Sequence, residues 1–174
     1  MPALTLVVQQ TGPSATPTQS AITNLRFASA DAANSGTASP IAIPSSGSVT
    51  SYFTTLYLNV STAPATSIQN IKFYMNGTNP WTGVTLQAGT AAAYTQSSGT
   101  SGVGLPLTPS NYAGLTGLAD AFSYTSATPL LLPGTIGATT GKVGQYLNLQ
   151  LTASSLALQG VLTGAQAYIQ YDEQ

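Results

Sequence analysis

Apolar and polar residues alternate along several short runs of the chain, which is the pattern of a β-strand with one buried face. β-branched and aromatic residues are concentrated in these runs, and Gly, Pro, Asn and Ser lie between them. The clearest runs are 52–60, 68–75, 143–151 and 165–171, and shorter candidates are 4–9, 21–28, 84–87 and 130–132. We therefore expect an all-β fold, a single antiparallel β-sandwich or jelly-roll-like barrel of about 7–8 short strands.

The two strongest runs are separated by a short link that contains Pro64. In 52–60, alternate positions such as Leu56 and Leu58 share one face, which suits a strand buried on that face only. Because the link 61–66 has turn-type residues, we expect 52–60 and 68–75 to pair as antiparallel neighbours. Helix-forming patterns are short and interrupted by glycine, so at most short helical pieces are expected.

The chain is expected to form one domain. Residues 1–20 are interpreted as an N-terminal strand or arm with a linker, and residues 21–174 as the β-sandwich domain. Within that domain, the least regular stretch is an insertion at about 89–141. Because a long structureless loop is uncommon inside a compact domain, we expect this insertion to project and to be supported by a partner.

Charged residues make up only 4% of the chain, and there is no His or Cys. These absences exclude zinc sites of the usual ligand types, a thiol nucleophile, disulfides and a Ser-His-Asp triad. Its three cations are Arg26, Lys72 and Lys142, too few for the basic surface that binds nucleic acid or anionic lipid. No apolar run approaches the length of a membrane-spanning helix. We expect no cofactor, metal, nucleic-acid or membrane partner.

The acidic residues give no convincing active site. They are Asp31, Asp120, Asp172 and Glu173. A glycosidase-like carboxylate pair is the functional alternative, but turn and helix-cap roles are the ordinary use of isolated Asp. The segment 31–36 is similar to the start of a calcium loop, yet Ala33 stands where an oxygen ligand is expected. We therefore expect no catalytic residues and a non-enzymatic protein.

Three further motifs each have a structural and a functional interpretation. Asn59 and Asn76 each begin a glycosylation triplet, although Asn76-Gly77 is better interpreted as a tight turn. Trp81 is either a sugar-stacking platform or an anchor in a core or interface. The Gly-rich stretch 99–104 lacks the context of a phosphate-binding loop, so a flexible loop is expected.

The surface composition favours association with other subunits. Thr and Ser make up about a quarter of the chain and the formal net charge is -1, so little repulsion keeps copies apart. Nine Tyr residues suit interfaces, because Tyr buries a large area at low entropic cost. The predicted interface residues are Leu4, Leu6, Val8, Trp81, Tyr112, Tyr168 and Tyr171.

The Met1 start without a secretory signal, the Thr/Ser/Ala/Gly-rich strand pattern and the terminal run 168–174 resemble small virion proteins of tailed bacteriophages or related viruses. The similarity is to capsid decoration and minor capsid proteins. It implies a β-sandwich or barrel, made in the host cytoplasm and located in the virion. Its partners would be a major capsid protein and other copies of itself, often as a trimer. The resemblance implies no active site.

Two other functions remain open. The chain is alternatively an extracellular filament or pilus subunit that donates the strand 4–8 to a neighbour, with 11–20 as the linker. It is alternatively a carbohydrate-binding adhesive module at the cell surface, based on Trp81 and the Tyr residues.

Overall fold

A computed structural model describes residues 5–12, 16–32, 38–160 and 162–174. In this part of the chain the fold is all-β, with one short 3-10 helix, η1 (Ala121–Ser123). The strands are β1 (Thr5–Thr11), β2 (Thr18–Ala21), β3 (Ser48–Thr50), β4 (Thr54–Val60), β5 (Ile68–Met75), β6 (Val84–Ala91), β7 (Gly99–Thr100), β8 (Val103–Gly104), β9 (Thr116–Asp120), β10 (Leu130–Leu131), β11 (Gly141–Ser154) and β12 (Ala167–Glu173).

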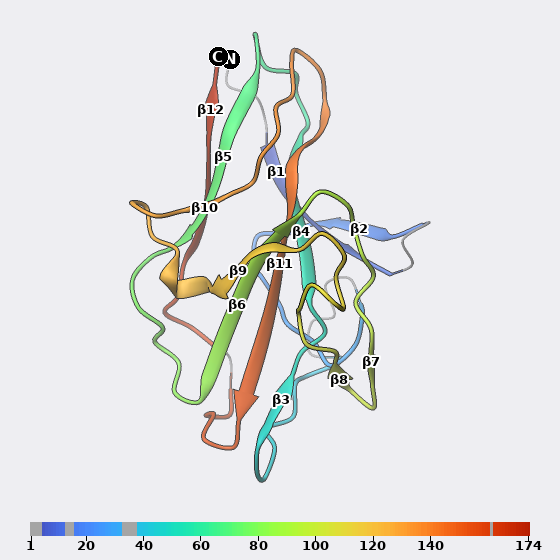
Figure 1. Cartoon of the computed structure of the whole chain (residues 1–174), viewed down its shortest axis with the longest axis vertical. Helices are drawn as coiled ribbons and strands as arrows, with labels where there is room; N and C mark the ends of the chain where they lie inside the picture. Colours follow the sequence, from blue (N-terminus) through green and yellow to red (C-terminus); the bar gives the residue numbers. More distant parts are fainter. Residues whose placement is uncertain (1–4, 13–15, 33–37, 161) are drawn as a thin grey trace.

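The strands form two main antiparallel sheets and one small hairpin. A seven-stranded sheet has the order β2-β1-β4-β11-β6-β9, with β3 paired to the end of β11. A three-stranded sheet has the order β10-β5-β12, and β7 pairs with β8. Figure 1 shows β11 between β4 and β6 in the middle of the molecule, and β5 beside β12. The expected antiparallel sandwich class is confirmed, and the open ends of both sheets exclude a closed barrel.

The main core lies between the two sheets. Alternate residues of β4, β6 and β11 face alternate residues of β5, as the period of two in a strand requires. The buried residues in this core are Leu56, Leu58, Val60, Ile68, Ile71, Phe73, Met75, Val84, Leu86, Ala88, Ala121, Leu130, Leu132, Val143, Leu147, Leu149, Leu151 and Ala153. The apolar alternation in the sequence therefore identifies the core-facing side of these strands.

The expected pairing of the two strongest runs is wrong. β4 pairs with β1 and β11, whereas β5 pairs with β10 and β12 in the other sheet. The link 61–67 carries the chain from one sheet to the other. Because both strands place apolar side chains in the same core, they pack face to face across it rather than edge to edge.

A local irregularity in β5 adds one residue to the core. Strict alternation places Ile68 on the side opposite Ile71, yet both side chains are buried. Asn70 lies between them with a φ of 55°, and the pairing with β12 shifts register at this point. This bulge turns Ile68 back to the core face.

The region 89–141 is not a projecting loop. It contains the end of β6, the β7–β8 hairpin, β9, η1 and β10. Part of it folds over the outer face of the large sheet and forms a second apolar cluster, in which the buried residues are Phe53, Ala91, Leu107, Tyr112 and Leu115. The expectation that β4 is buried on one face only is therefore also wrong, because Thr55 and Tyr57 on its outer face are buried.

The segment expected to be an arm and linker contributes to the large sheet. Strand β1 is hydrogen-bonded to β2 on one edge and to β4 on the other. Strand β2 ends at Ala21, so the predicted strand 21–28 does not form. Residues 22–27 instead run irregularly beside the open side of the sandwich, where Ile22, Leu25 and Phe27 pack against the core.

The close packing of the β7–β8 hairpin gives a first prediction. A Cβ at Gly104 would overlap the Ser51 carbonyl, so Gly104→Ala should lower the free energy of unfolding by about 1–3 kcal/mol. At Gly137 the nearest atom to an added Cβ is 3.9 Å away, so Gly137→Ala is the matched control and should be close to neutral. Urea unfolding measures both values. Equal stability of the two variants would contradict packing of this hairpin on the sheet.

Candidate functional site

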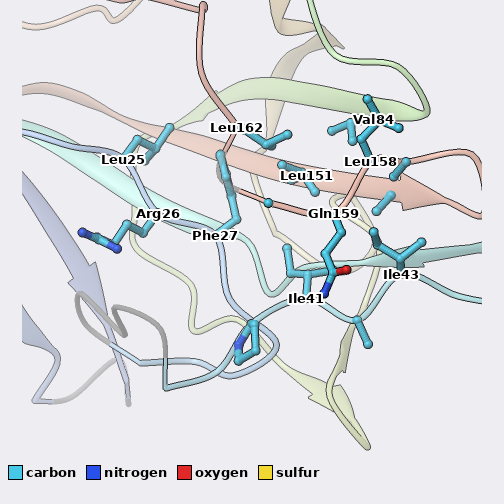
Figure 2. Close-up of a pocket in the computed structure, with 15 residues that line it drawn as sticks. Leu25, Arg26, Phe27, Ile41, Ile43, Val84, Leu151, Leu158, Gln159 and Leu162 are labelled. Carbon is cyan, nitrogen blue, oxygen red and sulfur yellow. The ribbon is translucent and has the colours of Figure 1, made fainter.

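An apolar groove lies at one end of the sandwich. Its floor consists of Val84, Leu151 and Ala153, from the inner face of β6 and β11. Its walls come from the irregular segments 25–27, 40–43 and 157–160 and from Leu162, and its volume is about 710 Å³. Figure 2 shows the side chains of these segments gathered around β11. The small sheet contributes none of the lining residues, so at this end the large sheet is covered by irregular chain alone.

Three of the residues that line this groove, Ile43, Leu158 and Leu162, have exposed large apolar side chains, and Leu156 lies two residues before Leu158 in the same loop. Leu156 is 73% exposed and Leu158 is 74% exposed, both in the loop between β11 and β12. Ile43 and Leu162 are also exposed. We call these four residues the apolar patch. Because single exposed leucines are ordinary but gathered ones mark interaction surfaces, the patch is the strongest candidate for a contact site.

The groove is almost free of ionisable groups. Arg26 is the only charged residue among those that line it. A second hollow of about 880 Å³ extends toward Trp81 and shares Leu25, Arg26, Phe27 and Leu162 with the first. Arg26 is also the only charged residue that lines the second hollow, so this arrangement suits the burial of apolar surface.

The predicted interface residues are not brought together. Leu4 lies outside the described residues, and for Leu6 only the backbone is described, paired with Asn59. Val8 and Tyr112 are buried within the chain, Tyr112 completely, so neither offers surface to a partner. Tyr171 is partly buried against the core.

Two of the predicted interface residues are aromatic side chains with partners in the same chain. The ring of Tyr168, which is 40% exposed, stacks on Tyr74 with the centroids 5.3 Å apart. The indole N–H of Trp81 donates to the carbonyl of Thr163 at 2.9 Å, and its ring meets Phe122 edge to face. This geometry favours Trp81 as an anchor that holds the 155–166 loop.

The sequence-based search missed the apolar patch because leucines in a loop give no periodic signal. Leu156 and Leu158 belong to a short run before Gly160 whose pattern predicts at most a short helical piece. In the structure they follow the end of β11, in a turn closed by the Ala157 N–H donating to the Ser154 carbonyl at 3.0 Å. The exposure of these two leucines depends on the path of the chain after it leaves β11, and the local sequence does not predict that path.

A buried side-chain amide holds the region 89–141, which we call the irregular region, on the outer face of the large sheet. The side-chain amide of Gln150 in β11 donates to the carbonyls of Ser51 and Leu105, at 2.7 and 2.8 Å. Its carbonyl oxygen accepts from the N–H of Leu107 at 2.6 Å. Gln150 is fully buried. These three bonds use both of its side-chain N–H donors and one of the two lone pairs of its carbonyl oxygen, without any charge.

Asp31 ties the first hairpin to the same irregular region. Its carboxylate accepts from the N–H of Gly12 at 3.1 Å, and the Tyr94 hydroxyl donates to the carbonyl of Gly12 at 2.6 Å. Burial raises the pKa of Asp31, although hydrogen bonds from Gln96 and Gly12 oppose this shift. Burial and the nearby Asp31 charge also raise the pKa of Tyr94.

Other acids have structural roles. Asp120 caps η1, because its carboxylate accepts from the N–H of Phe122 at 3.0 Å. Asp172 accepts from the side-chain amide of Asn70 at 2.7 Å, across the bulge in β5. Among the described residues, no group of three or more His, Cys, Asp or Glu side chains gathers as a metal site would require.

The structure also shows where the two glycosylation triplets and the Gly-rich stretch lie. Asn59 lies inside β4, between paired strands, whereas Asn76 is exposed in a bend after β5. The stretch 99–104 is the β7–β8 hairpin rather than a flexible loop. Within the described ranges, no helix is long and apolar enough to cross a membrane.

Comparisons with protein-family models, with curated proteins and with solved structures find no match to this chain. The geometry of the molecule is therefore the basis for any functional proposal.

Replacing Gln150 tests whether its side-chain hydrogen bonds hold the irregular region on the large sheet. Gln150→Leu removes the partner of the buried Leu107 N–H and of the Ser51 and Leu105 carbonyls, and each group that stays buried without a partner costs about 1–3 kcal/mol. We expect a large loss in thermal unfolding temperature and faster amide exchange at Leu107. Gln170→Leu, on the exposed face of β12, is the control and should change neither value. Unchanged exchange at Leu107 in the Gln150 variant would refute the assigned role.

The raised pKa of Asp31 gives a prediction with a defined sign. Because the folded pKa lies above the unfolded one, the folded state binds the proton more tightly, and this contribution to stability is lost as pH rises through the folded pKa. The side chain in Asp31→Asn stays neutral. The free energy of unfolding of this variant, relative to that of the wild type, should therefore increase from acidic to neutral pH. Thermal unfolding of both proteins across that range measures the difference. A difference that is independent of pH would exclude burial of the carboxylate as its cause.

Proposed function

We propose that the chain is a non-enzymatic structural subunit that joins an assembly through uncharged surfaces. The observation that carries this proposal is the apolar patch beside a groove in which Arg26 is the only charged lining residue. An exposed patch of this kind is costly in a free monomer, because burying a Leu side chain contributes about 1.5–3 kcal/mol. Leu156 and Leu158 are each more than two-thirds exposed, so a contact that covers them both has a substantial driving force.

A second copy of the chain is the occupant that we propose for the patch. The formal net charge is -1, so long-range repulsion between copies is small. The patch and the groove adjoin, so the leucines of one copy have an apolar surface to cover on the next. Closed oligomers, dimers or trimers, bury such surfaces without leaving a free end.

We further propose that the assembly is a virus particle, in which the chain acts as a capsid decoration or minor capsid protein. The resemblance of the sequence to such proteins supports this, as do its all-β sandwich and its neutral contact surface. Contacts made with few charges depend little on ionic strength, which suits a particle that persists outside a cell. In this proposal a major capsid protein is the second partner.

Strand donation by the N-terminal strand has less support. Residues 5–11 are paired on both edges with β2 and β4 of the same chain. A donated strand would first have to lose these two sets of hydrogen bonds.

The role of the apolar patch is tested by removing its two most exposed side chains. We expect the wild-type chain to self-associate to a similar extent at low and high salt, and the Leu156→Ser/Leu158→Ser variant to be shifted to monomer. Leu131→Ser is the matched control, because Leu131 is 56% exposed but lies on β10, outside the patch. Sedimentation velocity gives the oligomeric state. A monomeric wild type, or dissociation by salt, would overturn the proposal.

The virus-particle proposal has its own test. In purified particles that contain this protein, quantitative mass spectrometry should find it in a fixed ratio to the major capsid protein. Failure to find it in particles from cells that express it would reject this part of the proposal and leave self-association standing.

A further inference from the structure

We propose that Asn76-Gly77 is a site of spontaneous deamidation, at which Asn76 is converted to aspartate and isoaspartate. This is the only Asn-Gly pair in the sequence. Attack by the backbone nitrogen of the following residue on the Asn side chain is least hindered when that residue is glycine. The proposal does not depend on the assembly proposed above.

The structure places this pair where the reaction meets little resistance. Strand β5 ends at Met75 and β6 begins at Val84, so Asn76 and Gly77 lie outside both ladders. Asn76 is exposed, and Gly77 has a φ of 86°. A Cβ added to Gly77 would meet no atom within 4 Å. The backbone therefore has space to change conformation as a ring forms.

The reaction needs only hydroxide and water. After loss of its proton, the Gly77 nitrogen attacks the side-chain carbonyl carbon of Asn76, forming a new C–N bond. The bond from that carbon to the amide nitrogen breaks, and the nitrogen takes up a proton and leaves as ammonia. Water then opens the five-membered succinimide at either carbonyl, which yields aspartate or isoaspartate. No oxidation or reduction takes place.

Other asparagines of the described chain are protected by sequence or by contacts. Asn79 precedes Pro80, whose nitrogen carries no proton, and its side chain is held by the Trp81 N–H at 2.9 Å and the Val84 carbonyl at 2.7 Å. Asn59 lies within a strand paired on both edges and precedes Val60. Asn24 is also exposed but precedes Leu25, whose side chain hinders the attack.

The product adds a carboxylate to a chain with only four acidic residues and a formal net charge of -1. The N–H of Asn76 donates to the Gln166 carbonyl at 2.9 Å, and an aspartate keeps this bond. The extra backbone carbon of isoaspartate is placed at a bend with free space. We therefore expect an acidic form of the protein that keeps its fold.

Incubation of the purified full chain in mildly alkaline buffer tests the proposal. Isoelectric focusing should show a more acidic band that grows faster at alkaline than at mildly acidic pH and comigrates with the Asn76→Asp variant. Peptide mapping by mass spectrometry should place the change at Asn76, with Asn79 in the same loop unmodified. Circular dichroism of the acidic form should match that of the starting protein.

Two variants separate this site from others. Asn76→Gln should lose the acidic band, because its longer side chain forms the corresponding six-membered ring far more slowly. Asn24→Gln, at another exposed asparagine, should keep the band. An acidic band that persists in Asn76→Gln, or an unmodified Asn76 after prolonged alkaline incubation, would overturn the proposal.

Discussion

The structure depends on covering both faces of one long strand. β11 has 14 residues, pairs with β3 and β4 on one edge and with β6 on the other, and is buried at every position from Leu147 to Ala153 except Thr152. A central strand of this kind needs a layer of protein on each side. The small sheet covers part of one face. The irregular region after β6 covers the other face, through Gln150 and the second apolar cluster, which contains Tyr112. The rest of the fold follows from how these two covers are made.

Neutral amides and hydroxyls make the second cover possible in a chain with few charges. Burying an ionised side chain requires a partner ion, whereas an amide requires only ordinary hydrogen bonds. On the outer face of the large sheet, Thr55 donates to the side chain of Asn148 at 2.8 Å, and the Ser51 and Ser97 hydroxyls accept from the N–H groups of Leu151 and Phe53. The high content of Ser, Thr, Gln and Asn thus has an interior role as well as a surface one.

Local pattern in the sequence predicts strands well and their partners poorly. The runs 52–60, 68–75 and 143–151 all contain strands, because alternation is a property of neighbouring residues. The separation of β4 and β5 into different sheets depends on residues far along the chain, since β4 is completed by β11 and β5 by β12. Strict alternation would place Ile68 on the face opposite Ile71, but a bulge at Asn70 reverses the alternation, and nothing in the run marks that bulge.

The candidate contact site likewise combines strand residues that local pattern predicts with loop positions that it does not predict. Its floor consists of strand residues that the pattern identifies, such as Leu151, but its walls come from segments more than 100 residues apart in sequence, around Phe27 and Leu158. β11 ends beyond the cover of the small sheet, and the chain must then cross to β12. That crossing carries Leu156 and Leu158 into solvent at the end of the sheet that only irregular chain covers. Arg26 is the only charged residue among those that line the groove, so apolar contact is the main interaction that this end of the molecule offers to a partner.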